Sequence, residues 1–113
     1  MVEKRKFTRV NIKSVADIIL PGDEFEQGFV GGISRGGMEL YTQTEMGREI
    51  IYTIRLHFLF QEQEITETVQ GKIKWSASFK KAFVSGIEFT NPLNMTEHAN
   101  LLLFIEKAEA YYK

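Results

Sequence analysis

The sequence predicts an all-β fold with one C-terminal helix, in which six antiparallel strands form a barrel. Three observations predict it: apolar and polar residues alternate along several segments, short turns join these segments, and the spacing becomes helical near the end of the chain. Closing the sheet into a barrel leaves no strand edge exposed. At 113 residues the chain is expected to form one domain, with a basic arm (residues 1–13), a barrel (14–90) and a C-terminal helix packed on the barrel (91–113).

Six segments have the composition and alternation of strands, at residues 14–20, 25–33, 38–42, 50–60, 65–75 and 82–89. The pattern is clearest in the fourth segment, where apolar side chains occupy every second position. Gly71 interrupts the fifth segment and indicates a bulge or a sharp bend of the barrel there. Ile73 and Trp75 are expected to share one face of this strand, and residues 76–81 are expected to turn the chain into the last strand.

The spacing of apolar residues becomes helical after the last strand. Asn94, with Glu97 three positions later, fits a capping box, and the helix is expected to run to about Tyr112. One apolar stripe would cover the barrel: Leu101, Phe104, Ile105, Ala108, Tyr111 and Tyr112. Leu102 and Leu103 fall outside this stripe, so they are either half-buried or part of a surface for a protein partner or a second copy.

Charge is distributed unevenly along the chain, although the net charge is only −1. Up to Lys13 there are five basic residues and one acidic residue, and from Ser14 onward there are nine basic and fourteen acidic residues. A small barrel with a basic arm can bind single-stranded nucleic acid, but the net-acidic body argues against such a partner. A small anion held under the arm fits the distribution better.

Composition limits the chemistry further. The chain has no cysteine, which excludes disulfides and thiolate metal sites, and two histidines are a poor set of metal ligands. We therefore expect neither a metal nor a resident cofactor. No apolar run approaches the roughly twenty residues of a membrane span, and the charged start leads into no apolar segment. We expect a cytoplasmic location.

Residues 30–41 form a glycine-rich bend that leads into a strand. The bend has four glycines, which lack a Cβ and so can take positive φ and let the backbone approach a ligand: Gly31, Gly32, Gly36 and Gly37. Ser34 lies at the middle of the bend, and its hydroxyl can both donate and accept a hydrogen bond. Taken alone, such a bend is typical of a tight, exposed hairpin corner.

Arg5 and Arg9 lie four residues apart in the basic arm. In an extended segment these positions point the same way. Guanidinium groups bind phosphate oxygens in bidentate fashion and match the O6 and N7 acceptors of guanine. The alternative is a solvated basic terminus with no ligand.

Together these features resemble the PilZ family of cyclic di-GMP (c-di-GMP) receptors. Arg5 and Arg9 match its Arg-x-x-x-Arg signature, and Gly32-Ile33-Ser34-Arg35-Gly36-Gly37 matches its Asp/Asn-x-Ser-x-x-Gly signature except at the first position. There Gly32 stands where the family has an acidic or amide residue. Residues 71–75 and 86–89 are similar to later strands of the family, so the resemblance spans nearly the whole chain.

The resemblance implies a PilZ-like split barrel that binds c-di-GMP and signals to a partner. Arg5 and Arg9 would clamp phosphate and guanine edges, and Ser34 would hydrogen-bond the ligand. The remaining proposed site residues are Lys4, which would add charge, Gly36 and Gly37, which would let the loop approach, and Gly32. Lacking a side chain, Gly32 would weaken binding by roughly ten- to a hundredfold. A partner protein or self-association through the C-terminal helix is expected. The alternative is an adaptor that no longer binds the nucleotide.

Gly32-Ile33-Ser34-Arg35-Gly36 also fits the G-x-S-x-G elbow of serine hydrolases. That elbow requires a helix after the serine, within a large α/β sheet. Here the residues after the bend alternate as a strand, and the chain is too short for that fold. We therefore expect no enzymatic activity.

Overall fold

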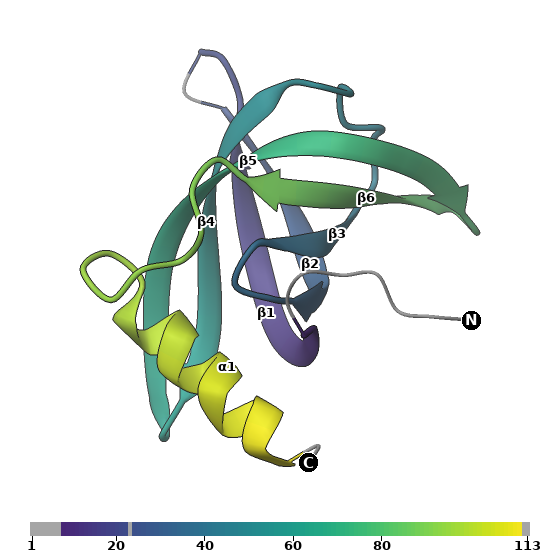
Figure 1. The fold of residues 1–113 in the computed structure, drawn as a ribbon. Helices are drawn as coiled ribbons and strands as arrows, with labels where there is room; N and C mark the ends of the chain where they lie inside the picture. Colours follow the sequence, from purple (N-terminus) through teal and green to yellow (C-terminus); the bar gives the residue numbers. More distant parts are fainter. Residues whose placement is uncertain (1–7, 23, 112–113) are drawn as a thin grey trace.

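The structure is a computed structural model that describes residues 8–22 and 24–111. It contains seven elements: β1 (Val10–Ile19), β2 (Phe25–Ile33), β3 (Gly37–Thr42), β4 (Ile51–Phe60), β5 (Gln63–Phe79), β6 (Ala82–Phe89) and α1 (Ala99–Tyr111). The strands pair antiparallel in a closed barrel of order β1-β2-β3-β6-β5-β4, and α1 lies at one end of it (Figure 1). The predicted six-stranded barrel with one C-terminal helix is confirmed.

Two strands are longer than the sequence indicated. β1 begins at Val10, because Val10 and Ile12 are buried and alternate with exposed Asn11 and Lys13. The charge of this segment had placed it in the basic arm. β5 continues to Phe79 through the predicted turn, since its last residues pair with β6. The chain turns at Lys80, which has a φ of 57°.

The face on which Trp75 lies differs from the prediction. The pairing of β5 with β6 shifts register between Ile73 and Trp75, so Ile73 points into the barrel and Trp75 lies outside it. Gly71, where a bulge or a sharp bend was expected, pairs regularly with Tyr52 and Phe89 and so carries no bulge. The shift therefore occurs a few residues later than predicted, and it moves an aromatic side chain to the outer surface.

The glycines of the bend do not take positive φ. Among the described residues, the glycine that has a positive φ is Gly22, at 83°, in the turn between β1 and β2. Gly31 and Gly32 belong to β2, whose pairing with β3 is irregular between Val30 and Ile33. The left-handed conformation that glycine permits is not used here, because Gly31 and Gly32 are extended in a bulged strand and only residues 34–36 form the turn.

Helix α1 is capped by a residue from the barrel. Asn94 accepts a hydrogen bond from the Glu97 amide at 2.9 Å, but it caps a turn that precedes the helix. At the helix itself, the Glu67 carboxylate of β5 accepts hydrogen bonds from the Asn100 and Leu101 amides, both at 3.0 Å. The Asn94 amide donates to His98 Nδ1 at 3.3 Å and not to Glu97, so the predicted capping box is not formed. Asn94 caps the preceding turn, and Glu67 satisfies the first amides of the helix.

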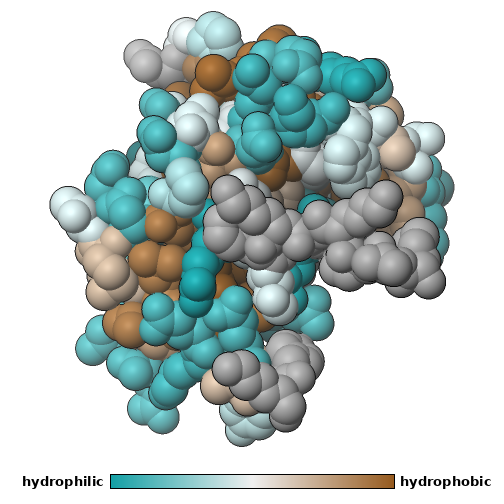
Figure 2. All heavy atoms as spheres, in the orientation of Figure 1, coloured by the Kyte–Doolittle hydropathy of each residue, from teal (hydrophilic) through white to brown (hydrophobic). Residues whose placement is uncertain are grey.

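The apolar stripe of α1 is also rotated from the prediction. Leu101, Leu102 and Ile105 are buried, whereas Tyr111 is 91% exposed. Phe104 packs edge-on against Phe58 and Phe60 of β4, with ring centroids 6.3 and 6.1 Å apart. Figure 2 shows hydrophilic residues over much of the side of α1 that faces the viewer. Leu103, outside the predicted stripe, is exposed.

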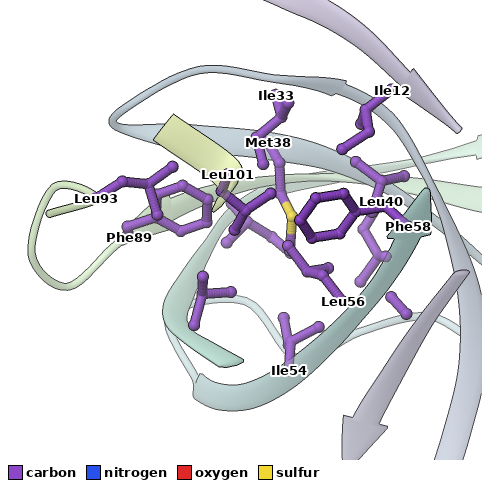
Figure 3. Close-up of a cluster of buried hydrophobic side chains, with 14 of the residues drawn as sticks. Ile12, Ile33, Met38, Leu40, Ile54, Leu56, Phe58, Phe89, Leu93 and Leu101 are labelled. Atoms are coloured by element: carbon purple, nitrogen blue, oxygen red, sulfur yellow. The ribbon is translucent and has the colours of Figure 1, made fainter. Parts of the chain in front are cut away.

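A single hydrophobic core fills the barrel and continues to the helix. Side chains from the strands point inward and meet Leu93 and Leu101 from the segment after β6 (Figure 3). The largest fully buried side chains are Ile18, Ile33, Met38, Leu40, Ile54, Leu56, Ile73, Leu101 and Ile105. No helix within residues 8–22 and 24–111 has the length and apolar character to cross a bilayer.

Replacing Glu67 with alanine is expected to lower the free energy of unfolding by about 1–2 kcal/mol, because two helix amides lose their acceptor. Urea unfolding would measure this loss. Glu64→Ala is the matched control, since Glu64 is an exposed residue on the same strand. Equal losses for both variants would contradict the capping role of Glu67.

Candidate functional site

The turn between β2 and β3 is held closed by its own hydrogen bonds. The Ser34 hydroxyl accepts from the Gly36 amide at 3.2 Å and donates to the Gly37 carbonyl at 3.4 Å. The Ser34 amide also donates to the Gly37 carbonyl, at 2.8 Å. Ser34 is only 6% exposed. In this structure its hydroxyl therefore serves the shape of the turn.

Gly37 lets β3 approach β6 closely. A Cβ at this position would collide with the backbone carbonyl of Ile87 on β6. The neighbouring Gly36 carbonyl accepts a hydrogen bond from the Phe89 amide at 2.9 Å, which fixes the turn to the same strand. The glycine is required here by packing, and any side chain would push the two strands apart.

Arg9 is anchored to the outer face of the barrel just before β1. Its Nη1 donates to the Glu39 carboxylate of β3 at 2.8 Å. The two side chains are 25% and 28% exposed, so this ion pair is partly shielded from water. Glu39 was missed by sequence reasoning, which assigned residues 38–42 to a strand and gave none of them a role in the site.

Gly32 lies next to this ion pair. It is paired with Asn11 of β1, and a Cβ built on it would meet the Arg9 Cδ at 4.0 Å and the Val10 carbonyl oxygen at 3.7 Å. Both are ordinary contact distances. The backbone at Gly32 can therefore carry a side chain, and that side chain would start beside Arg9.

Glu39, Gly86 and Trp75 form a row across β3, β6 and β5 on the outside of the barrel. Glu39 pairs with Gly86, and Gly86 pairs with Trp75. The Trp75 indole covers Gly86 so closely that a Cβ there would collide with it. Since Trp75 remains 40% exposed, an aromatic surface lies two strands away from Glu39, on the far side of β6.

The turn is also connected to the C-terminal helix. Arg35 Nη2 donates to the Glu109 carboxylate of α1 at 2.9 Å. The Arg35 carbonyl accepts from the Leu93 amide at 2.9 Å, in the segment that leads to α1. A displacement of the turn would therefore move two points of the C-terminal region, Leu93 before α1 and Glu109 within α1.

The structure brings together most of the residues expected to form the site. Arg9 and Gly32 are neighbours, and Ser34, Gly36 and Gly37 continue from them through the turn. Lys4 and Arg5, which complete the predicted set, lie outside the described residues. Within the described part of the chain, no cluster of three or more His, Cys, Asp or Glu residues is placed to hold a metal ion.

The arrangement is a partly buried arginine at the edge of a glycine-rich turn on the outer face of a small barrel. The sequence model of the PilZ domain family matches residues 3–107, so this chain belongs to the PilZ family. The match covers both arginines of the arm and the glycine-rich signature. No curated protein matches the sequence.

Solved structures of PilZ proteins have the same fold. The motility inhibitor MotI/DgrA of Bacillus subtilis aligns over 94% of this chain with a TM-score of 0.76 and 13% identity. The PilZ domain of Escherichia coli YcgR, solved with c-di-GMP, aligns over 97% of this chain and 95% of that domain, with a TM-score of 0.71 and 11% identity. This chain spans about half of MotI/DgrA (52%) and of the longer YcgR structure (49%).

Proposed function

We propose that this chain binds c-di-GMP on the outer face of β2 and β3 and acts as a signal receiver. The observation that carries the proposal is the position of Arg9, whose side chain passes beside Gly32 and whose guanidinium pairs with Glu39 of β3. A guanidinium at this position can bind a phosphate or the outer edge of a guanine. Membership of the PilZ family and the ligand in the YcgR structures support the choice of nucleotide.

Each residue of the proposed site has a distinct role. Arg9 and Arg5 clamp the ligand from the arm, and Lys4 adds unspecific positive charge. Ser34 and Gly36 hold the turn in shape through the hydrogen bonds within it. Gly37 keeps β3 close to β6 and so fixes where the turn ends. The site binds and does not catalyse.

Trp75 extends the proposed site across the barrel. One side of its indole packs on Gly86, and the exposed part offers a flat surface to solvent. Stacking of a base on an aromatic ring contributes about 1–3 kcal/mol. We propose that a guanine of the ligand reaches this surface from the Arg9 side.

The signal leaves the site through helix α1. Because Arg35 ties the turn to Glu109, a ligand that moves the turn alters the position of the helix. Leu103 and Tyr111 are exposed on α1 and would contact a partner protein or a second copy in the cytoplasm. Closure of the arm over the ligand would also change the surface that a partner protein meets.

Isothermal titration of the protein with c-di-GMP tests the proposed binding, and saturable heat that GMP does not produce is expected. Absence of binding together with a stable protein partner in a pull-down would indicate an adaptor that does not use the nucleotide. Binding of short oligonucleotides with a steep inverse salt dependence would instead indicate a nucleic-acid module. Either result would overturn the proposed function.

Replacing Glu109 with glutamine is expected to uncouple the helix from the site. In the wild-type protein, c-di-GMP should change hydrogen exchange of the α1 amides, and in Glu109→Gln that change should largely disappear. The affinity should shift by less than about fivefold, the lower end of typical allosteric coupling. Glu106→Gln, an exposed position on the same helix, is the control. An unaltered exchange response in Glu109→Gln would contradict this route.

A further inference from the structure

We infer that Glu39 supplies, from β3, the carboxylate that the PilZ signature has at the position of Gly32. This inference rests on the proposed c-di-GMP site and adds a binding residue to it. The sequence signature alone predicts a site without its acidic group. The structure indicates that the group is present and comes from the neighbouring strand.

The strand pairing places Glu39 opposite Gly32. Ile33 pairs with Met38 and Val30 pairs with Leu40, and the register shifts between these two pairs. Two residues of β2, Gly31 and Gly32, therefore face the single residue of β3 that lies between Met38 and Leu40. That residue is Glu39, which makes it the cross-strand neighbour of the glycine that breaks the signature.

The same arginine side chain lies beside both positions. A side chain on Gly32 would start 4.0 Å from the Arg9 Cδ, and the Glu39 carboxylate bonds the Arg9 Nη1 at 2.8 Å. Gly31 cannot substitute for Gly32 in this respect, since a Cβ there would lie 2.7 Å from the Tyr41 ring. An acidic residue at position 32 and Glu39 would thus act on the same arginine from adjacent strands.

A carboxylate at this place has two uses for a guanine nucleotide. It fixes the orientation of the Arg9 guanidinium. A guanidinium that is already oriented loses less conformational entropy when it binds a phosphate. It also has about four lone-pair sites, of which the Arg9 bond uses one. The others can accept hydrogen bonds from the N1–H and N2–H groups of guanine, which are donors.

General electrostatics makes the opposite prediction. The ligand carries two negative charges, so a nearby carboxylate repels it, and removing that charge should tighten binding. If Glu39 only occupies Arg9 in the empty protein, Glu39→Gln should therefore raise the affinity. If Glu39 replaces the missing signature residue, the same substitution should lower it. The two roles are separated by the sign of one measured change.

The test is titration of five proteins with c-di-GMP: wild type, Glu39→Gln, Glu88→Gln, Gly32→Asp and the double variant Gly32→Asp/Glu39→Gln. Glu39→Gln is expected to bind at least about tenfold more weakly, the loss typical of one hydrogen bond to a charged group. Glu88→Gln removes an equal charge from an exposed position on β6, opposite Gly37, and should bind as well as wild type or slightly better. The double variant should regain most of the lost affinity.

The outcomes separate this inference from the proposed function. No binding by the wild-type protein overturns both. Wild-type binding with equal or tighter binding by Glu39→Gln overturns the role of Glu39 and leaves the proposed function intact. A weakened Glu39→Gln that Gly32→Asp does not rescue overturns the equivalence of the two positions. Gly32→Asp alone should change the affinity by less than about threefold, because Glu39 already serves Arg9. Thermal unfolding of each variant confirms that it is folded.

Discussion

Arg9→Ala is expected to lower the affinity for c-di-GMP by at least about a hundredfold. Arg9 is the described residue of the arginine pair, and it is held against the barrel by Glu39 at 2.8 Å. Its loss removes two charge-assisted hydrogen bonds to a phosphate or a guanine edge, each contributing about 1.5–3 kcal/mol. Isothermal titration at fixed salt concentration measures the change.

Two further variants show whether geometry or charge is responsible. Arg9→Lys keeps the charge but loses the planar fork, so it should bind roughly tenfold more weakly than wild type. Lys13→Ala removes an equal charge from β1, at an exposed position, and should change the affinity by less than about threefold. Equal losses of affinity in Arg9→Ala and Lys13→Ala would mean that Arg9 contributes only its positive charge and makes no specific contact with the ligand.

Gly37→Ala is expected to destabilise the fold by about 3 kcal/mol, the upper range for overpacking a well-packed site. The added methyl collides with the Ile87 carbonyl, which is backbone and cannot rotate away. Thermal unfolding should show a fall in Tm of roughly 10 °C or more. Binding of c-di-GMP should be lost as well, because the turn that holds Ser34 ends at Gly37.

Gly32→Ala provides the matched control within the same signature. Its new methyl would meet no atom closer than 3.7 Å, and its φ is not positive. We expect a change in stability within about 1 kcal/mol, in either direction, since alanine also reduces the freedom of the unfolded chain. Similar destabilisation by both substitutions would contradict the distinction between a glycine required by packing and a replaceable one.

The fold could be predicted from the sequence because its signals are local. Alternation in the fourth strand, polar turns and the helical end each report on a few neighbouring residues. The errors arise where the structure of a segment depends on residues that are far away in the sequence. The start of β1 depends on burial of Val10 in a core made by other strands, and the outward Trp75 depends on a register shift against β6. The helix cap comes from Glu67, far away in the sequence.

The candidate site divides in the same way. The glycine-rich signature and the two arginines are short motifs, so the sequence indicated Arg9, Ser34 and the glycines directly. Glu39 lies thirty residues from Arg9, and only the pairing of β2 with β3 shows that it faces Gly32. The contact of Arg35 with Glu109, seventy-four residues apart, was equally inaccessible.

The most direct test is a titration of ¹⁵N-labelled protein with c-di-GMP, followed by amide chemical shifts. We expect the largest shifts on Arg9, Gly32 and residues 34–37, with a saturation curve that matches the calorimetric affinity. Smaller shifts should appear in α1 through Arg35. Saturable binding whose largest shifts lie on another face of the barrel, with the β2–β3 turn unaffected, would contradict the proposed site.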